Sequence, residues 1–397
     1  MQQQSLNDET SAPDSIGIDS GFVTLLASAW PRGTGGSEPM MTESRECVVI
    51  GGGPAGATFA SIVGKYAPQL SVTVLEKDIF PRWHIGESTI PVANGILRDL
   101  EIYDELINST HIKKIGAVFV WGKNRDPWNI EFLELDGLAV GDVSTDTIDV
   151  RGQDFGSLLE NLHQPDKPFL SFNVRRAEFD DLLLNKAREF GADVREGTRA
   201  TEVVKDDWGR VTAVRWRDRK GNSGTIETPF VLDAAGLNAM MTRNNRERDP
   251  NMNNFAVYGY LSGAEWKVTY NGSHEYTTLF VSSIENGWIW YFPVDEDVMS
   301  VGVVTNTAHF KDRLKNIDIE PFFWESLESC PELRELIKPA KLRDDILPDG
   351  KKVGACQDWS SRAREFVGDG WAAAGDAAVF IDPVLATGLT VAIMTGH

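Results

Sequence analysis

One stretch limits the possible folds more than any other, the segment 46–66 that reads ECVVIGGGPAGATFASIVGKY. A short apolar strand comes first, then glycines in the spacing GxGxxG, then a helix of small residues. Glycines so spaced let the backbone turn tightly and approach a pyrophosphate, which rests on the N-terminus of the helix. The predicted phosphate loop contains Gly51, Gly53, Pro54, Ala55 and Gly56.

A second strand and an acidic residue complete this pattern. The stretch SVTVLEK reads as a strand that ends in Glu76, 20 residues after Gly56, with Lys77 next to it. An acidic residue at this distance binds the hydroxyl pair of a ribose. A glycine-rich turn without a ligand would not need this glutamate, so the segment predicts a Rossmann βαβ unit with Glu76 and Lys77 at the nucleotide. The unit alone does not distinguish FAD from NAD.

Composition narrows the class of protein. The chain has 397 residues, 42% of them hydrophobic, which allows one large domain or two interleaved ones. A formal charge of −20 argues against nucleic acid and anionic membranes as partners, because both attract basic patches. Three widely spaced cysteines and six histidines without HExxH spacing predict neither a disulfide framework nor a metal site. Such cysteine usage is typical of a reduced, cytoplasmic protein.

Residues 1–45 differ from the rest in being rich in polar residues, glycine and proline. Their apolar stretch GFVTLLASAW lacks the positive leader of a signal peptide, since the first basic residue is Arg32. We expect a disordered extension, or a start assigned too early with Met40 or Met41 as the true start. No apolar run reaches the roughly 18 residues of a spanning helix, so no membrane span is predicted.

The second half of the chain holds two more loops that suit a nucleotide. In VLDAAG, Asp233 and Gly236 follow a strand, and in AAAGDAAVFIDP, Asp376 follows a glycine and can accept a hydrogen bond from a sugar hydroxyl. The pair Thr387 and Gly388 opens a helix and presents backbone N–H groups to an anion or a flavin carbonyl. Taken singly, each is equally compatible with an ordinary loop.

The order of the motifs GxGxxG, FPRWHIGES, VRRAEFDDLL, VLDAAG and AAAGDAAVFIDP resembles the FAD-dependent monooxygenase-like superfamily. Within it, the chain from about residue 46 onward looks like a flavin-dependent halogenase of the branch that acts on phenols and carrier-tethered groups. The resemblance implies an α/β fold in which a Rossmann-type FAD-binding domain (GR2, p-hydroxybenzoate-hydroxylase-like) is interleaved with a β-sheet substrate domain. It also implies FADH2 from a separate NAD(P)H-dependent flavin reductase, and chloride or bromide as halide.

The stretch NGWIWYFPVD bears on the reaction. Trp288 and Trp290 are two residues apart, so on a strand they face the same side. The family signature is Trp-x-Trp-x-Ile-Pro, and here Phe292 replaces the isoleucine. In the family these tryptophans are thought to keep the organic substrate from the flavin. A packed aromatic strand without such a role is the alternative.

The stretch HIKKIGAVFVWG contains two adjacent lysines before a strand. Such a pair is commonly an ordinary solvated strand start. The resemblance places Lys114 at the position of the family's catalytic lysine, whereas Lys113 is expected to point elsewhere. An amine there would hold hypohalous acid, by a hydrogen bond or as a haloamine, and deliver it to an electron-rich ring. To act so, the amine must be partly neutral, which burial would favour.

Other residues correspond to the family by position. Arg176 matches an arginine that contacts the nucleotide portion of FAD, with a surface arginine as the alternative. Glu87 and Ser88 match a loop that lines the cofactor, although Ser88 is equally suited to cap a helix. Asp382 matches the family's Asp-Pro, where it is expected near the cofactor.

The turn formed by Thr387 and Gly388 matches one that is thought to bind halide through backbone N–H groups. Leu385 stands where the tryptophan-specific branch has a glutamate. This argues against free tryptophan as the substrate, and the general base stays unnamed.

The predicted organisation has an extension at 1–45, an FAD domain at 46–245, a substrate sheet domain at 246–350 and a second FAD part at 351–397. Residues 123–173 read as an irregular insertion within the first part. Family members run further than His397, so we expect the second part to be truncated. The alternatives to a halogenase are an FAD-dependent monooxygenase or geranylgeranyl-reductase-like enzyme, and a non-catalytic FAD-binding remnant. Halide dependence separates the first two.

Overall fold

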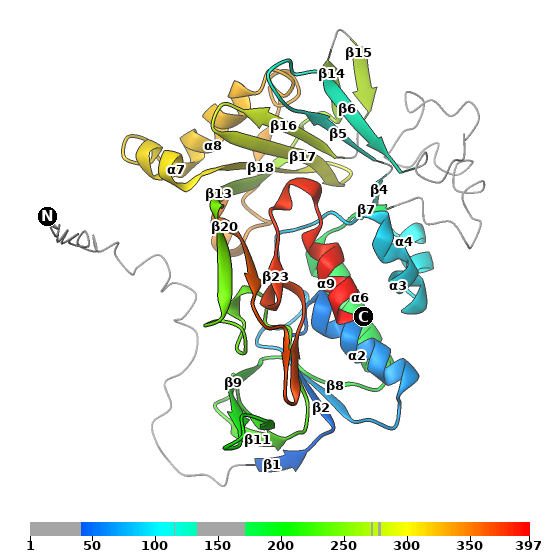
Figure 1. Cartoon of the computed structure of the whole chain (residues 1–397). Helices are drawn as coiled ribbons and strands as arrows, with labels where there is room; N and C mark the ends of the chain where they lie inside the picture. Colours follow the sequence, from blue (N-terminus) through cyan, green and yellow to red (C-terminus); the bar gives the residue numbers. More distant parts are fainter. Residues whose placement is uncertain (1–40, 115, 133–170, 271–272, 277–278) are drawn as a thin grey trace, which may run out of the picture.

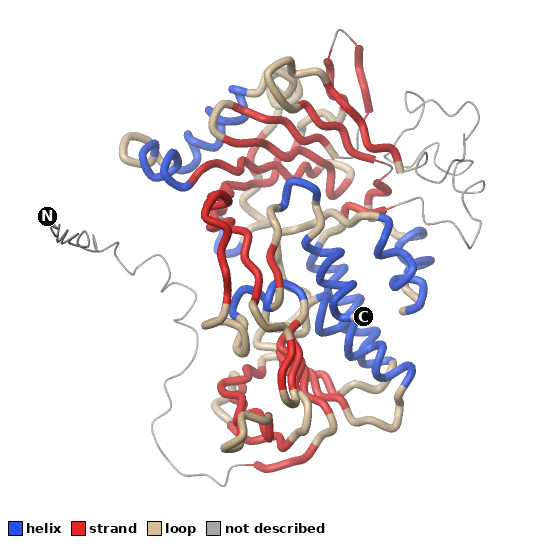
Figure 2. The backbone as a smooth tube through the Cα atoms, viewed as in Figure 1, coloured by secondary structure: helices blue, strands red, loops and turns tan. Residues whose placement is uncertain are grey.

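The structure is a computed structural model of the chain, and it describes residues 41–114, 116–132, 171–270, 273–276 and 279–397. Two main sheets lie one above the other (Figure 1). Two long antiparallel strands of the larger sheet, β13 (Arg246–Ser262) and β20 (Val353–Ala363), extend from it toward the smaller sheet (Figure 2). None of the helices in this described part is long and apolar enough to cross a membrane.

The smaller main sheet has six strands in the order β21-β22-β12-β2-β3-β8, and all but β21 pair in parallel. Three long helices lie together along one face (Figure 1). The strands are β2 (Cys47–Ile50), β3 (Val72–Leu75), β8 (Asp193–Arg195), β12 (Val231–Asp233), β21 (Val367–Gly368) and β22 (Trp371–Ala373), and the helices are α2 (Pro54–Tyr66), α6 (Arg176–Glu189) and α9 (Gly388–Gly396).

Alternation along β2 explains why both faces of this sheet are covered. Val49 packs among residues from the helices, including Phe179 and Leu183 of α6. Its neighbour Val48 packs on the opposite side with Trp216. That side is covered by a four-stranded sheet of β1 (Met41–Ser44), β9 (Thr198–Lys205), β10 (Val211–Asp218) and β11 (Ser223–Glu227). A strand buried on both faces needs apolar residues throughout, as CVVI provides.

The larger sheet has nine strands and is covered on one side by two helices, α7 and α8 (Figure 1). Its strands are β5 (Gly116–Val120), β6 (Pro127–Glu131), β13, β16 (Phe280–Ile284), β17 (Gly287–Asp295), β18 (Val298–Asn306), β19 (Lys341–Leu342), β20 and β23 (Val379–Phe380), and the helices are α7 (Thr307–Arg313) and α8 (Ile319–Ser329).

The remaining elements are short. They comprise the strand pairs β4 (Ile112–Lys114) with β7 (Ser171–Asn173) and β14 (Lys267–Tyr270) with β15 (Ser273–Tyr276), the helices α3 (Asn94–Asp99) and α4 (Tyr103–Asn108), and the 3-10 turns η1 (Pro91–Ala93), η3 (Gly236–Asn238), η4 (Pro348–Gly350), η5 (Gly375–Ala377) and η6 (Pro383–Leu385).

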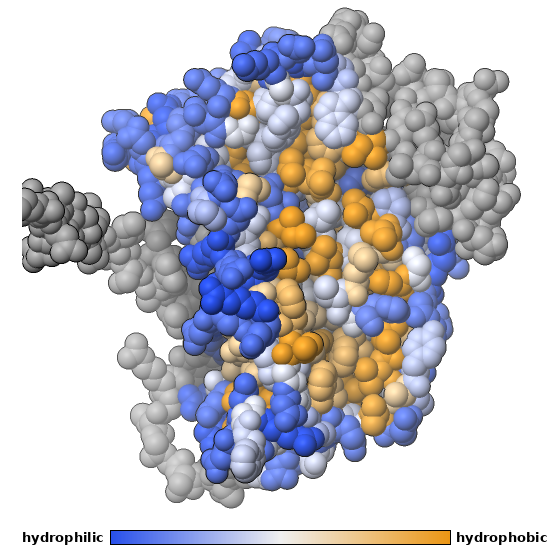
Figure 3. Space-filling model, viewed as in Figure 1, coloured by the Kyte–Doolittle hydropathy of each residue, from blue (hydrophilic) through white to orange (hydrophobic). Residues whose placement is uncertain are grey.

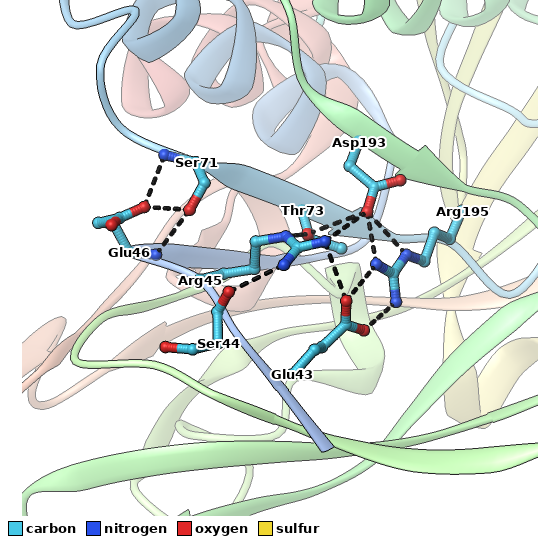
Figure 4. A network of polar contacts seen from close by, with 8 residues as sticks. All are labelled: Glu43, Ser44, Arg45, Glu46, Ser71, Thr73, Asp193 and Arg195. Carbon is cyan, nitrogen blue, oxygen red and sulfur yellow. Dashed lines mark hydrogen bonds and ion pairs between the residues drawn. The ribbon is translucent and has the colours of Figure 1, made fainter. Parts of the chain in front are cut away.

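The expected extension at 1–45 reaches too far into the chain, because β1 begins at Met41. Glu43 of β1 forms ion pairs with Arg45 and with Arg195 of β8, and Arg195 also pairs with Asp193 (Figure 4). Hydrogen bonds between backbone groups of β1 and β11 add to this attachment. The described structure therefore already includes the five residues before the predicted boundary at 46, whereas residues 1–40 lie outside the described residues.

The predicted division into consecutive segments also needs correction. Between residues 246 and 350, the larger sheet contains β13, β16, β17, β18 and β19. However, the larger sheet also takes β5 and β6 from before residue 246, and β20 and β23 from after residue 351. The insertion predicted at 123–173 contains β6 and β7 at its ends, and 133–170 lie outside the described residues.

Candidate functional site

The glycine loop is formed as predicted and tolerates no side chain at two positions. Gly51 has a φ of +103°, and a Cβ there would lie 2.4 Å from the Ala234 carbonyl oxygen. A Cβ at Gly56 would lie 2.0 Å from the Gly51 oxygen. At Gly53 the nearest atom to such a Cβ is Arg82 Nη2, at 3.5 Å. The loop therefore packs tightly against the sheet and is more open at Gly53.

Glu76 lies at the end of β3, beside this loop. Its carboxylate accepts hydrogen bonds from the backbone N–H groups of Gly52 and Asp78, both at 2.7 Å. Burial raises the pKa of Glu76, against the effect of these two bonds. Lys77 is exposed and pairs with Asp78 at 3.2 Å. Glu76 thus fixes the loop from inside, and contacts of Glu76 and Lys77 with a nucleotide stay predictions.

Arg176 makes contacts that differ from the expected ones. Its Nε and Nη2 donate to the two carboxylate oxygens of Asp180, at 2.7 and 2.8 Å. Its Nη1 donates to the carbonyls of Ile85 and Gly86, at 2.8 and 3.0 Å. All three guanidinium nitrogens are therefore engaged, and Arg176 holds the segment FPRWHIGES against α6. The alternative of a surface arginine is wrong, because Arg176 is buried.

Arg82 is a residue that the sequence reasoning missed. Its Nη1 donates to Asp180 at 3.0 Å, while its Nη2 lies beside Gly53. The side chain keeps 18% of its surface exposed, unlike that of Arg176. A signal was present in the sequence, because an arginine stands between the acidic end of β3 and the glycine of HIGES.

Two acidic residues follow the last strand of the parallel sheet. Burial raises the pKa of Asp376 to about 6, although the guanidinium groups of Arg176 and Arg246 oppose this shift. The Asp382 carboxylate accepts hydrogen bonds from the local Val384 N–H at 3.0 Å and from the side-chain amide of Asn254 on β13 at 3.3 Å. Asp382 therefore stabilises the turn η6, which leads to the predicted halide loop.

The predicted halide loop has unusual backbone geometry. Ala386 adopts a left-handed conformation with a φ of 54°, which residues other than glycine rarely adopt. Thr387 follows and is the N-terminal boundary residue of α9, whose first residue is Gly388. The Thr387 hydroxyl oxygen is buried without a partner among the described residues. The helix opened by Gly388 is thus confirmed, and halide binding stays a prediction.

Trp288 and Trp290 face the same side of β17, as predicted, and both are buried in one aromatic cluster. The Trp290 ring lies 6.0 Å from the Trp288 ring and 6.5 Å from the Tyr258 ring, measured between centroids. Its Nε1 donates to the Ser300 hydroxyl at 3.2 Å. Glycine at position 302 makes room for this ring, because a Cβ there would lie 2.2 Å from Trp290 Cζ2.

Glu87 points toward this aromatic cluster. Its Oε1 accepts from the Tyr260 hydroxyl at 2.7 Å, and that hydroxyl in turn accepts from Trp83 Nε1 at 2.9 Å. Burial raises the pKa of Glu87 to about 7, against the effect of the Tyr260 hydrogen bond. The side chain of Glu87 thus connects the segment FPRWHIGES to β13. The partner Tyr260 was missed because it is 173 positions away in the chain.

Lys114 ends β4, and its side chain is 1% exposed. Its Nζ donates to the Ser88 hydroxyl and to the Thr89 carbonyl, both at 2.9 Å, and lies 5.5 Å from the centre of the Phe132 ring. Burial lowers the pKa of Lys114 to about 7. No carboxylate among the described residues opposes this shift, so burial favours the neutral amine.

Lys113 points away from Lys114, as predicted. Its Nζ donates to the backbone carbonyls of Ser109 and His111, at 2.5 and 2.9 Å. Ser88, the residue beside Glu87, hydrogen-bonds Lys114 and does not cap a helix. The segment FPRWHIGES therefore joins three parts of the site: the arginines near the glycine loop, the tryptophan strand and the buried lysine.

A known protein family matches most of this chain. The sequence profile of a protein family described as tryptophan halogenase matches residues 46–395. The 1H-pyrrole-2-carbonyl-(peptidyl-carrier protein) chlorinase of Pseudomonas fluorescens is 28% identical over 89% of this chain and 74% of its own. Tryptophan 2-halogenase of Chondromyces crocatus is 30% identical over 89% of this chain and 60% of its own.

The fold is also similar to solved structures. The myxobacterial chondrochloren halogenase superposes with a TM-score of 0.73 at 28% identity, over 89% of this chain and 73% of that chain. The chain thus spans between 60% and 74% of the length of these three relatives.

Proposed function

Because this chain belongs to the tryptophan halogenase family, the flavin-dependent halogenases, we propose that it halogenates an electron-rich aromatic or carrier-bound substrate through Lys114. The reaction would use FADH2 from a separate NAD(P)H-dependent flavin reductase, O2, and chloride or bromide. The observation that carries this proposal is a lysine buried without a counter-ion among the described residues. Burying an amine in this way is costly, and a structural role would not need it.

The residues around the glycine loop fit FAD. Gly51 and Gly56 have no Cβ atom, which lets the loop pack tightly. The loop leads into the N-terminus of α2, and a helix N-terminus favours a pyrophosphate. Arg82 would supply the cation to that pyrophosphate, with Arg176 and Asp180 holding it in place. At the other end of the site, the α9 N-terminus and the unpartnered Thr387 hydroxyl suit a halide.

When bound, reduced FAD supplies hypohalous acid from O2 and halide. The neutral amine of Lys114 then attacks the halogen, so that a nitrogen–halogen bond forms and the oxygen–halogen bond breaks. The departing oxygen takes one amine proton and leaves as water. The halogen next passes to the ring carbon of the substrate, and the ring proton returns to the nitrogen. Burial of Lys114 keeps water from competing for the halogen.

The substrate class rests on chemistry and on the relatives. A halogen carried on nitrogen is an electrophile, so it requires an electron-rich ring such as a phenol or pyrrole. One relative acts on a pyrrole tethered to a carrier protein and another on tryptophan, as their names state. Leu385 is half exposed in the halide loop and lacks the carboxylate of the tryptophan branch. We therefore place phenols and carrier-bound pyrroles ahead of free tryptophan.

Halide dependence tests this function. The protein is loaded with reduced FAD and mixed with O2 and bromide, small molecules are removed quickly, and an electron-rich phenol is added. Mass spectrometry should find the brominated ring, and a reaction without bromide should leave the phenol unchanged. Hydroxylated phenol that forms regardless of bromide would instead identify an FAD-dependent monooxygenase. Bound FAD with no product of either kind would identify a non-catalytic remnant.

Arg82→Met should weaken FAD binding about tenfold, because a guanidinium–phosphate bond contributes on the order of 1.4 kcal/mol or more. Flavin fluorescence during titration measures the affinity, and the loss should shrink at high salt. Arg215→Met is the matched control, since Arg215 of β10 is an exposed arginine that pairs with Glu202 of β9. Unchanged FAD affinity in Arg82→Met would rule out this contact.

A further inference from the structure

Among the described residues, both polar groups within hydrogen-bonding distance of Lys114 Nζ present acceptors to it. Thr89 offers a backbone carbonyl, which can only accept. Ser88 offers a hydroxyl, which has a single hydrogen, and that hydrogen points to Asn173 Oδ1 at 2.8 Å. Toward Lys114, Ser88 therefore presents lone pairs only.

We propose that Asn173 is a positioning residue for halogen transfer, because it holds the Ser88 hydrogen away from the Lys114 nitrogen. A neutral amine has two N–H groups and one lone pair. With both neighbours fixed as acceptors, the two N–H groups point to Ser88 and Thr89, and the lone pair stays available to the halogen. This inference rests on the proposed function, in which Lys114 carries the halogen.

The backbone fixes this arrangement from three sides. Asn173 pairs with Ile112 across the strands β7 and β4, and Ser88 forms a bridge to the same Asn173. The Thr89 N–H donates to the Phe172 carbonyl at 2.9 Å. Asn173 and Ser171 are both fully buried, and the Ser171 hydroxyl lies 2.6 Å from that of Thr89. The amide is thus placed within hydrogen-bonding distance of the Ser88 hydroxyl.

Loss of the Asn173 acceptor should turn the Ser88 hydroxyl from an acceptor toward Lys114 into a donor. Its hydroxyl would then rotate and donate to the Lys114 lone pair, since a buried donor without a partner is costly. The amine would lose its nucleophilic pair while keeping its place and its burial. Removal of the Ser88 hydroxyl should reverse this effect, because the competing donor is then absent.

The experiment uses the full chain with reduced FAD, bromide and O2 in five forms: wild type, Asn173→Leu, Ser88→Ala, the double variant and Lys114→Met. Two products are measured, the brominated phenol and the hypobromous acid that escapes to a scavenger in solution. Asn173→Leu should lower the brominated fraction about tenfold with total oxidant unchanged. The double variant should recover to the level of Ser88→Ala.

A double variant as low as Asn173→Leu would overturn the proposal, as would Asn173→Leu that matches wild type. Lys114→Met with wild-type bromination would instead contradict the proposed function itself. FAD titration and thermal unfolding check that each variant folds. If Asn173→Leu does not fold, Asn173→Asp decides, because a carboxylate also accepts from Ser88. Asn173→Asp should still brominate the phenol, but the pH at which its bromination rate rises should be higher than in wild type. Loss of bromination at every pH would refute the role of Asn173.

Discussion

Lys114→Met should lower single-turnover bromination at least about 100-fold, the usual effect of removing a group that takes part in the chemical step. FAD affinity should stay within about twofold. Methionine preserves the length and apolar stem of the side chain, so the variant removes the amine and little else. Lys113→Met is the matched control, because Lys113 is the adjacent lysine and, within the described part of the chain, donates to the backbone carbonyls of Ser109 and His111. Equal losses in both variants would contradict the assignment.

The same variant should be more stable than wild type at pH 7. The pKa of Lys114 falls from 10.5 to about 7 on burial, so the unfolded chain binds more protons than the folded one between these values. Folding stability contributed by this group therefore rises with pH across that window and is lowest at and below pH 7. Lys114→Met removes this cost but also loses two hydrogen bonds. The net increase in the free energy of unfolding should be on the order of 2 kcal/mol at pH 7.

Thermal unfolding at several pH values measures this difference. The gain in Tm of Lys114→Met over wild type should shrink as the pH rises from 7 toward 10. The bromination rate of wild type should rise through pH 7, as the amine becomes neutral. A Tm difference that does not change with pH would show that Lys114 is not buried as an uncompensated amine.

Gly302→Ala should lower the free energy of unfolding by about 2–3 kcal/mol, the cost of overpacking a core. Gly302 lies opposite Trp290 on β17 and Tyr258 on β13, and its missing Cβ is where the Trp290 ring sits. The ring must therefore move, which should shift the tryptophan fluorescence. If Trp290 also shields the flavin, hydroxylated product should increase relative to brominated product.

Gly95→Ala provides the comparison. Gly95 lies in α3, and a Cβ there would meet no atom within 4 Å. Alanine should therefore stabilise this helix, by about 0.5–1 kcal/mol. Denaturant unfolding of both variants measures the two effects. A Gly302→Ala protein as stable as Gly95→Ala would show that the Trp290 ring relocates without cost.

Sequence reasoning was most successful where one short segment determines both the structure and the role. The glycine loop is such a case, because the spacing of its glycines indicates both the tight turn and the role. The local contact at Gly56 is with Gly51, whereas the contacts that exclude a side chain at Gly51 come from Ala234 and Ala235. Trp288 and Trp290 are another, since a two-residue period fixes their common face. The position of Lys114 came from resemblance, and its burial became known only with the fold.

Long-range partners could not be predicted in this way. Asp180 accepts hydrogen bonds from two arginines, Arg82 and Arg176. Nothing in VRRAEFDDLL indicates that Arg82 reaches Asp180 from an earlier segment. The contact of Ser88 with Asn173 depends on how β7 returns beside β4. Helix capping by Ser88 was plausible locally and was displaced by this tertiary contact.

The order in which the larger sheet can assemble follows from its strand order. Val118 of β5 pairs with Phe280 of β16, and Ser361 of β20 pairs with Phe380 of β23. During synthesis, β5 leaves the ribosome long before its parallel partner β16. One edge of β13 can pair with β18, whereas the other lacks its main partner until β20 is made. A topology with such high contact order folds slowly and exposes unpaired strand edges meanwhile. Fragments that end before β20 should therefore aggregate, and slow translation with chaperone support should raise the yield of the whole chain.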